Sequence, residues 1–133
     1  MPVAVGLVLA LLVGVFGTAT GLDRDRAFYP VITIIVATYY ILFAVVGEAS
    51  QALWPEMMIA GAFIIAAVVG FRRSLWIVVA ALAAHGILDL MHGSVVSNPG
   101  VPESWPGFCM GYDVLAAAYL AWRLRSGRIR AVA

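Results

Sequence analysis

The chain has 133 residues, of which 64% are hydrophobic and 11% are charged, with a formal net charge of +1. Soluble domains average about 45–50% apolar and about 25% charged residues, so the composition excludes an ordinary soluble enzyme, and we expect no nucleic-acid partner. A membrane-spanning helix needs about 20 apolar residues. Five such helices nearly fill the chain, which predicts an all-α, polytopic membrane helix bundle forming a single transmembrane domain over residues 1–133.

Five apolar segments predict five transmembrane helices. They cover residues 2–22, 27–47, 54–71, 74–96 and 107–124. The first segment carries no charge and lacks the basic start of a signal peptide, so we expect a retained helix. Its glycines Gly14, Gly17 and Gly21 offer a small-residue face for helix packing, and we expect this helix to be peripheral. The Pro- and Gly-rich stretch 97–107 predicts a loop.

The arginines predict the orientation of the chain. All eight basic residues are arginines, and they lie after the first and third apolar segments and at the end of the fifth. The connections around Glu48–Trp54 and Ser97–Pro106 contain none. Basic residues near the ends of spanning helices mark the cytoplasmic side. We therefore expect a bacterial inner-membrane protein with its N-terminus outside and its C-terminus in the cytoplasm.

Ionisable residues interrupt the apolar segments at one level. An ionisable group inside a membrane helix costs about 2.5–3.5 kcal/mol on insertion scales and usually marks function. The positions of His85, Asp89 and His92 fall on one helical face. Asp113 follows Cys109 by one turn, and Glu48 and Glu56 lie near the outer ends of their segments. With the predicted orientation, all of these residues converge in the outer half of the bundle, where no arginine is present to neutralise the carboxylates.

Clustered carboxylates without a basic partner repel one another, and a bound cation would neutralise them. Imidazole with carboxylate suits zinc, iron or manganese better than calcium or magnesium. His85 and His92 are about 10.5 Å apart along a helix at 1.5 Å per residue, so one ion is not expected to bind both. Either His85 with Asp89, or Asp89 with His92, would hold an ion together with Asp113 and a glutamate. Two ions bridged by Asp89 are an alternative, whereas haem is not expected.

A motif of this segment resembles a known family. The pattern H-x-x-x-D-x-x-H over His85–His92, a Pro-rich loop and then C-x-x-x-D over Cys109–Asp113 resembles an uncharacterised family of small bacterial multi-helix membrane proteins, a domain of unknown function. Trp54-x-Glu56 and the basic turn before residue 27 are similar as well. The resemblance implies a multi-helix membrane fold and one shared polar site, and it implies no reaction.

Two functional hypotheses follow. The first is a metal-dependent hydrolase or oxidoreductase acting on a lipid-soluble substrate, with metal ligands among His85, Asp89, His92 and Asp113, and Glu56 or Glu48 as the base. The loop over residues 97–107 would cover its entrance. The second is a small transporter, a proton relay or a non-catalytic subunit of a membrane complex. Polar residues are scarce in the inner halves of the segments, which favours a site over a pore. Structural hydrogen bonding alone is the third interpretation of the cluster.

Overall fold

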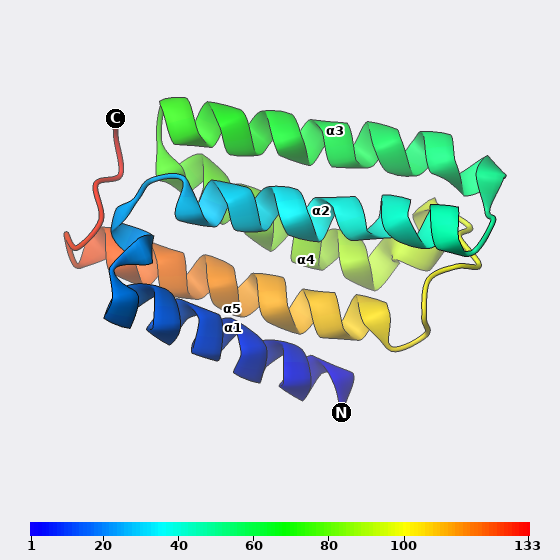
Figure 1. Ribbon diagram of the computed structural model, residues 1–133, viewed down its shortest axis with the longest axis horizontal. Coiled ribbons are helices and arrows are strands. Elements are labelled where there is room, and N and C mark those ends of the chain that lie inside the picture. The colour runs from blue at the N-terminus through cyan, green and yellow to red at the C-terminus, as the bar shows by residue number, and fades with distance from the viewer.

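The computed structural model describes all 133 residues and consists of helices joined by short connections (Figure 1). The helices are α1 (Pro2–Thr20), the 3-10 turn η1 (Leu22–Arg24), α2 (Phe28–Val46), α3 (Ser50–Arg72), α4 (Leu75–Val95) and α5 (Trp105–Arg125). Consecutive helices run antiparallel, and the N- and C-termini lie at opposite ends of the bundle. The all-helical fold and the presence of five long helices confirm the predicted all-α class.

Four helices, α1 to α4, are long and apolar enough to cross a membrane, which fits a multi-pass membrane protein. The fifth, α5, does not meet that criterion. It carries Asp113, Arg123 and Arg125, and it packs between α1 and α4. Asp113 and Arg123 are buried against these neighbours, and such charged residues make α5 the least apolar of the five helices.

The start of α3 differs from the prediction by four residues. The segment was expected to begin at residue 54, but the helix begins at Ser50, and Pro55 lies inside it. Its additional first turn buries Ala52, which is 2% exposed, against Ala44 and Val96. Glu48 supports the sharp reversal before it with a left-handed φ of 53°. Burial of small apolar groups at this turn stabilises the longer helix.

Helix α1 lies at the edge of the bundle and packs on α5. Its outward face exposes large apolar side chains such as Val8, Leu12 and Phe16, in keeping with the predicted peripheral position. The closest approach uses Gly6 of α1 and Gly111 of α5, where a Cβ would collide with the backbone of the other helix.

The other glycines of α1 have different roles. Gly14 packs on the ring of Tyr119, and Gly17 packs on Phe28. Gly21 was predicted to belong to the same packing face, and this is wrong. It ends α1 as a C-cap with φ 79°, a conformation that glycine adopts without steric cost.

We expect Gly111→Ala to loosen the contact between α1 and α5. The new methyl group would meet the carbonyl oxygen of Val3, and such overpacking costs about 1–3 kcal/mol. Gly61→Ala is the matched control, because a Cβ there meets nothing within 4 Å and alanine favours the helix. Unfolding by SDS in mixed micelles should show a loss for Gly111→Ala only. Equal stability of the two variants would contradict the close packing described for these helices.

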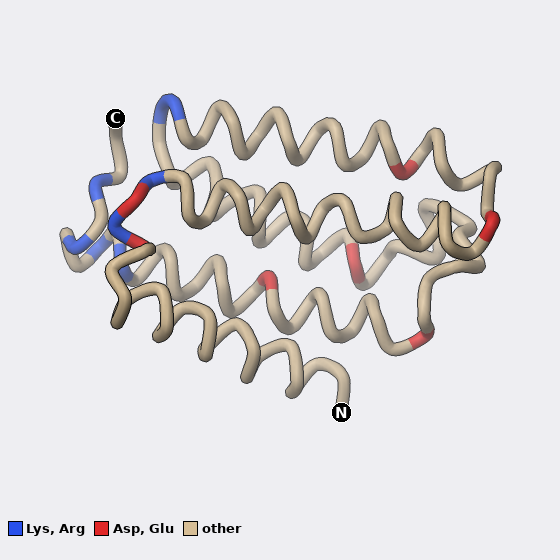
Figure 2. Tube along the Cα trace, viewed as in Figure 1, with Lys and Arg blue, Asp and Glu red and all other residues tan.

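The charged residues are separated along the bundle (Figure 2). All arginines lie at one end, here called the arginine end, and the opposite end, which holds the α2–α3 turn and the α4–α5 connection, is called the loop end. Between the arginine end and the middle of the bundle, apolar side chains such as Val78, Leu82 and Leu120 form the main core, each with 0% exposure. This part of the interior is largely apolar.

A buried ion pair ties the arginine end together. Asp23 lies in the charged turn between α1 and α2, and its side chain is 0% exposed. It lies 2.8 Å from Arg123 Nε of α5, and Thr18 Oγ1 donates a hydrogen bond to it at 2.7 Å. Thr18 also pairs with the Tyr119 hydroxyl at 2.9 Å. The pair therefore joins α1, η1 and α5 at one point.

Candidate metal centre

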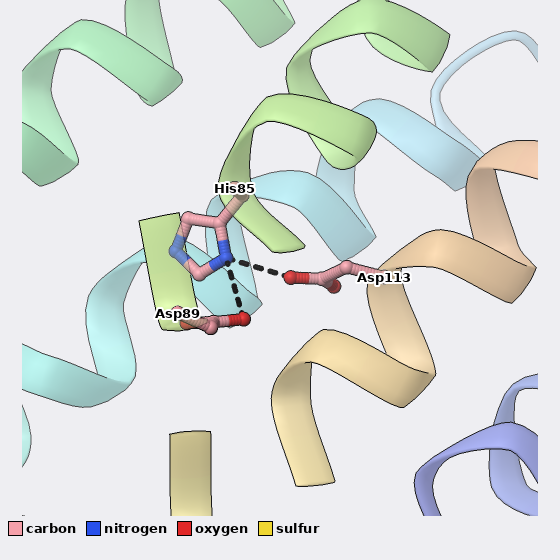
Figure 3. A group of neighbouring side chains, drawn as sticks. All are labelled: His85, Asp89 and Asp113. Carbon is pink, nitrogen blue, oxygen red and sulfur yellow. Dashed lines mark hydrogen bonds and ion pairs between the residues drawn. The ribbon is translucent and has the colours of Figure 1, made fainter. Parts of the chain in front are cut away.

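Three ionisable side chains meet in the interior between α4 and α5 (Figure 3). His85 Nδ1 lies 2.6 Å from Asp113 Oδ2 and 3.6 Å from Asp89 Oδ2. One donor atom from each residue lies within 4.8 Å of the others. The three residues are 1%, 1% and 0% exposed for His85, Asp89 and Asp113, respectively. This group, called the triad below, can hold a metal ion, as the sequence predicted for these three residues.

Two helices position the triad. His85 and Asp89 are separated by four residues on α4, so their side chains lie one above the other on the same face. Asp113 comes from α5, which packs against that face. Gly86 permits the close approach, because a Cβ there would lie 3.4 Å from Asp113 Cβ and 3.2 Å from a methyl group of Val114.

Tyr40 of α2 fixes the orientation of Asp89. Its hydroxyl donates a hydrogen bond to Asp89 Oδ1 at 2.7 Å. The other oxygen, Asp89 Oδ2, is then left to face His85. The Tyr40 ring stacks on His92 with centroids 3.8 Å apart, and Phe63 presents an edge-on ring to His85 at 4.8 Å. Aromatic rings therefore enclose the polar atoms, and the triad is held by side chains that cannot rotate freely.

Two carboxylate oxygens of the triad have no hydrogen-bond partner. These atoms are Asp89 Oδ2 and Asp113 Oδ1, and both are inaccessible to solvent. A buried polar atom without a partner costs about 1–3 kcal/mol and more when it is charged. With a neutral imidazole the triad would carry two negative charges, which a divalent cation would balance. The donor set of one nitrogen and carboxylate oxygens matches zinc, iron or manganese, so the residues fit such an ion.

His92 and Glu56 form a second pair, nearer the loop end. His92 Nε2 lies 2.9 Å from Glu56 Oε1, and both residues are buried. Asn98 from the α4–α5 connection donates hydrogen bonds to Glu56 Oε1 at 2.9 Å and to the Tyr40 carbonyl at 3.1 Å. His92 was predicted as a metal ligand and Glu56 as the base, but neither belongs to the triad. Instead, the two side chains are hydrogen-bonded to each other.

The remaining predicted residues lie apart from the triad. Glu48, the second proposed base, is exposed in the α2–α3 turn, and Glu103 is exposed in the α4–α5 connection. Cys109 is buried and unpaired, and it lines a cavity of about 210 Å³ between α1, α2 and α5 whose ten lining residues are all apolar. His92 and Asn98 line a different, polar cavity of about 290 Å³ below the connection.

The sequence predicted the three triad residues but not how the surrounding side chains organise them. It offers three tyrosines as hydrogen-bond donors into the site, Tyr39, Tyr40 and Tyr112, and nothing in it distinguishes Tyr40 as the one that meets Asp89. Asn98 lies in a loop and had no distinguishing pattern. Its double hydrogen bond depends on the return of the α4–α5 connection over α2 and α3, which helical periodicity does not describe.

Comparisons with known proteins found no relative. The chain matches no family model, no curated protein and no solved structure. The predicted likeness to a family of small bacterial membrane proteins therefore stays a prediction, and the triad is interpreted from its own geometry.

Proposed function

We propose that this protein is a five-helix inner-membrane protein that binds one divalent transition-metal ion at His85, Asp89 and Asp113. The observation that carries the proposal is the pair of buried carboxylate oxygens without partners, on Asp89 and Asp113, next to one imidazole nitrogen. In the low-dielectric interior such oxygens need a cation or protons. A single divalent ion serves both carboxylates at once.

The proposed orientation has the loop end outside and the arginine end in the cytoplasm. Its support is the separation of charges along the bundle, with every arginine at one end and the termini at opposite ends. Helix α5 would be the fifth spanning helix. It is 21 residues long and antiparallel to α4, and its polar groups are largely covered by other helices. The triad then faces the outer half of the membrane.

The number of ligands in the triad is relevant to whether a bound ion would be catalytic or structural. Three protein ligands leave a coordination position for water or substrate, which is the usual arrangement of catalytic rather than structural zinc. A bound ion would supply Lewis acidity there. The apolar cavity beside Cys109 supports a lipid-soluble substrate for a hydrolase or oxidoreductase. The side-chain contacts support ion binding more directly than catalysis. Glu56, which was predicted to be the catalytic base, is already hydrogen-bonded to His92 and Asn98.

A second candidate function is proton handling, and one observation favours it. His85 Nδ1 and Asp113 Oδ2 are only 2.6 Å apart, the arrangement of a proton shared between an imidazole and a carboxylate. A transmembrane relay would need further polar groups toward the arginine end. The core there contains apolar side chains such as Leu82 and Leu120 and also buries Tyr29 and Thr33. No hydrogen bond joins these two polar side chains to the triad, which supports a closed site over a path.

Chelator and pH separate these two functions. An ion must displace the proton of His85 Nδ1, because imidazole binds metal only when neutral. An ion bound only to the folded protein raises its thermal midpoint. In detergent, a strong chelator should therefore lower the midpoint at pH 8, and the difference should vanish at acidic pH, where protons replace the ion on the ligand atoms. A midpoint that is indifferent to chelator at every pH would leave proton handling as the better description.

A further inference from the structure

The arginine end carries positive charge that the protein itself does not neutralise. Among its arginines only Arg123 pairs with a carboxylate, that of Asp23. Arg26 donates to the carbonyl oxygens of Arg130 and Phe71. The other arginines with exposed side chains have no carboxylate partner; they are Arg24, Arg72, Arg73, Arg125, Arg128 and Arg130. Eight arginines against two aspartates leave six positive charges on the side chains at this end, so anions from outside the chain must balance them.

Two of these arginines are held beside tryptophans. The guanidinium of Arg125 lies 5.8 Å from the ring centroid of Trp76, and that of Arg128 lies 5.9 Å from Trp122. The two rings are 40% and 51% exposed. Exposed tryptophans at helix ends settle at the headgroup level of a membrane, and an arginine within about 6 Å of such a ring is attracted to it. The rings therefore hold both guanidinium groups where lipid phosphates lie.

Both arginines come from one short turn. Arg125 is the last residue of α5, residues 126–128 follow it directly, and Gly127 adopts φ 68° to reverse the chain. The turn places one arginine against Trp76 of α4 and the other against Trp122 of α5. The chain then folds back over this end, where Leu75 N donates to the carbonyl oxygen of Ala131 at 2.8 Å. The turn is thus tied down on both sides, and its two arginines are presented together.

We propose that this turn, with Trp76 and Trp122, binds the phosphate of an anionic phospholipid. Guanidinium groups form paired hydrogen bonds with phosphate oxygens, and the cytoplasmic leaflet is the anionic one. The exposed tryptophan faces lie beside the acyl chains and the guanidinium groups beside the phosphate. The site rests on the proposed orientation, with the arginine end in the cytoplasm. It does not rest on the metal ion, because it lies at the arginine end and shares no residue with the triad.

Lipid retention by the purified protein tests this site. Native mass spectrometry of the full chain in neutral detergent would follow binding of phosphatidylglycerol and, as the neutral reference, phosphatidylcholine. We expect phosphatidylglycerol to bind at least tenfold more tightly than phosphatidylcholine. Arg125→Gln/Arg128→Gln should weaken phosphatidylglycerol binding about 10- to 30-fold, because the hydrogen bonds that the two guanidinium groups donate to the phosphate are lost.

A control with the same loss of charge makes the result specific. Arg72→Gln/Arg73→Gln removes two exposed arginines from the α3–α4 turn, which have no aromatic partner, and should weaken binding less than threefold. Arg125→Lys/Arg128→Lys keeps the charge and should retain intermediate binding, which shows that the variant is folded. Equal losses in the two glutamine variants, equal affinity for both lipids, or full competition by inorganic phosphate would each overturn the proposal.

Discussion

Arg123→Met is expected to lower the free energy of unfolding by about 3–5 kcal/mol, because it leaves a buried charge without its partner. Asp23 is 0% exposed and Arg123 is 3% exposed, and they are 2.8 Å apart. No other arginine lies within ion-pair distance of this carboxylate. The loss is a large part of the 5–15 kcal/mol that stabilises a typical folded domain. SDS unfolding in mixed micelles would measure it.

The matched control is Arg24→Met, which removes an exposed arginine close to Asp23 in the sequence. Surface substitutions of this kind stay within about 0.5 kcal/mol. The double variant Asp23→Asn/Arg123→Met should recover part of the loss, because it removes the unpaired charge as well. If Arg123→Met were no less stable than Arg24→Met, the buried pair would not be what joins α1, η1 and α5.

The helices could be predicted because each rests on a local pattern. Apolar runs of the right length located all five within four residues of their observed ends. The main discrepancy, the start of α3 at Ser50, arises from the contact of Ala52 with Ala44 and Val96. That contact belongs to the packing of a turn against a loop. The burial of Asp23 could not be predicted for a similar reason, since its partner Arg123 lies 100 positions further along the chain.

The part of the site that lies on α4 could be predicted, because helical geometry alone decides which of its residues lie close together. The four-residue spacing of His85 and Asp89 places them together, and the seven-residue spacing to His92 separates it from His85. Which acid each histidine meets depends on how α3 and α5 pack against α4. Asp113 of α5 reaches His85, and Glu56 of α3 reaches His92. The sequence therefore identified the ionisable residues but not their division into two groups.

Asp89→Asn should remove the bound ion while the fold remains. An amide carries no charge to neutralise a cation, and its oxygen can still accept the hydrogen bond from Tyr40. Changing a residue that only hydrogen-bonds to a metal ligand already weakens metal binding by about 10- to 100-fold. Loss of one of the three ligands themselves should therefore weaken metal binding by about 100-fold or more. Glu103→Gln is the control, because Glu103 is an exposed loop residue outside the triad.

The metal content of the purified protein tests the central claim most directly. Wild-type protein and the two variants would be extracted in neutral detergent, loaded with zinc or manganese at pH 8, freed of excess metal and analysed for ions per chain. We predict one ion per chain in the wild type and in Glu103→Gln, and none in Asp89→Asn. A metal-free wild type, or an Asp89→Asn variant that retains a full equivalent, would contradict the account.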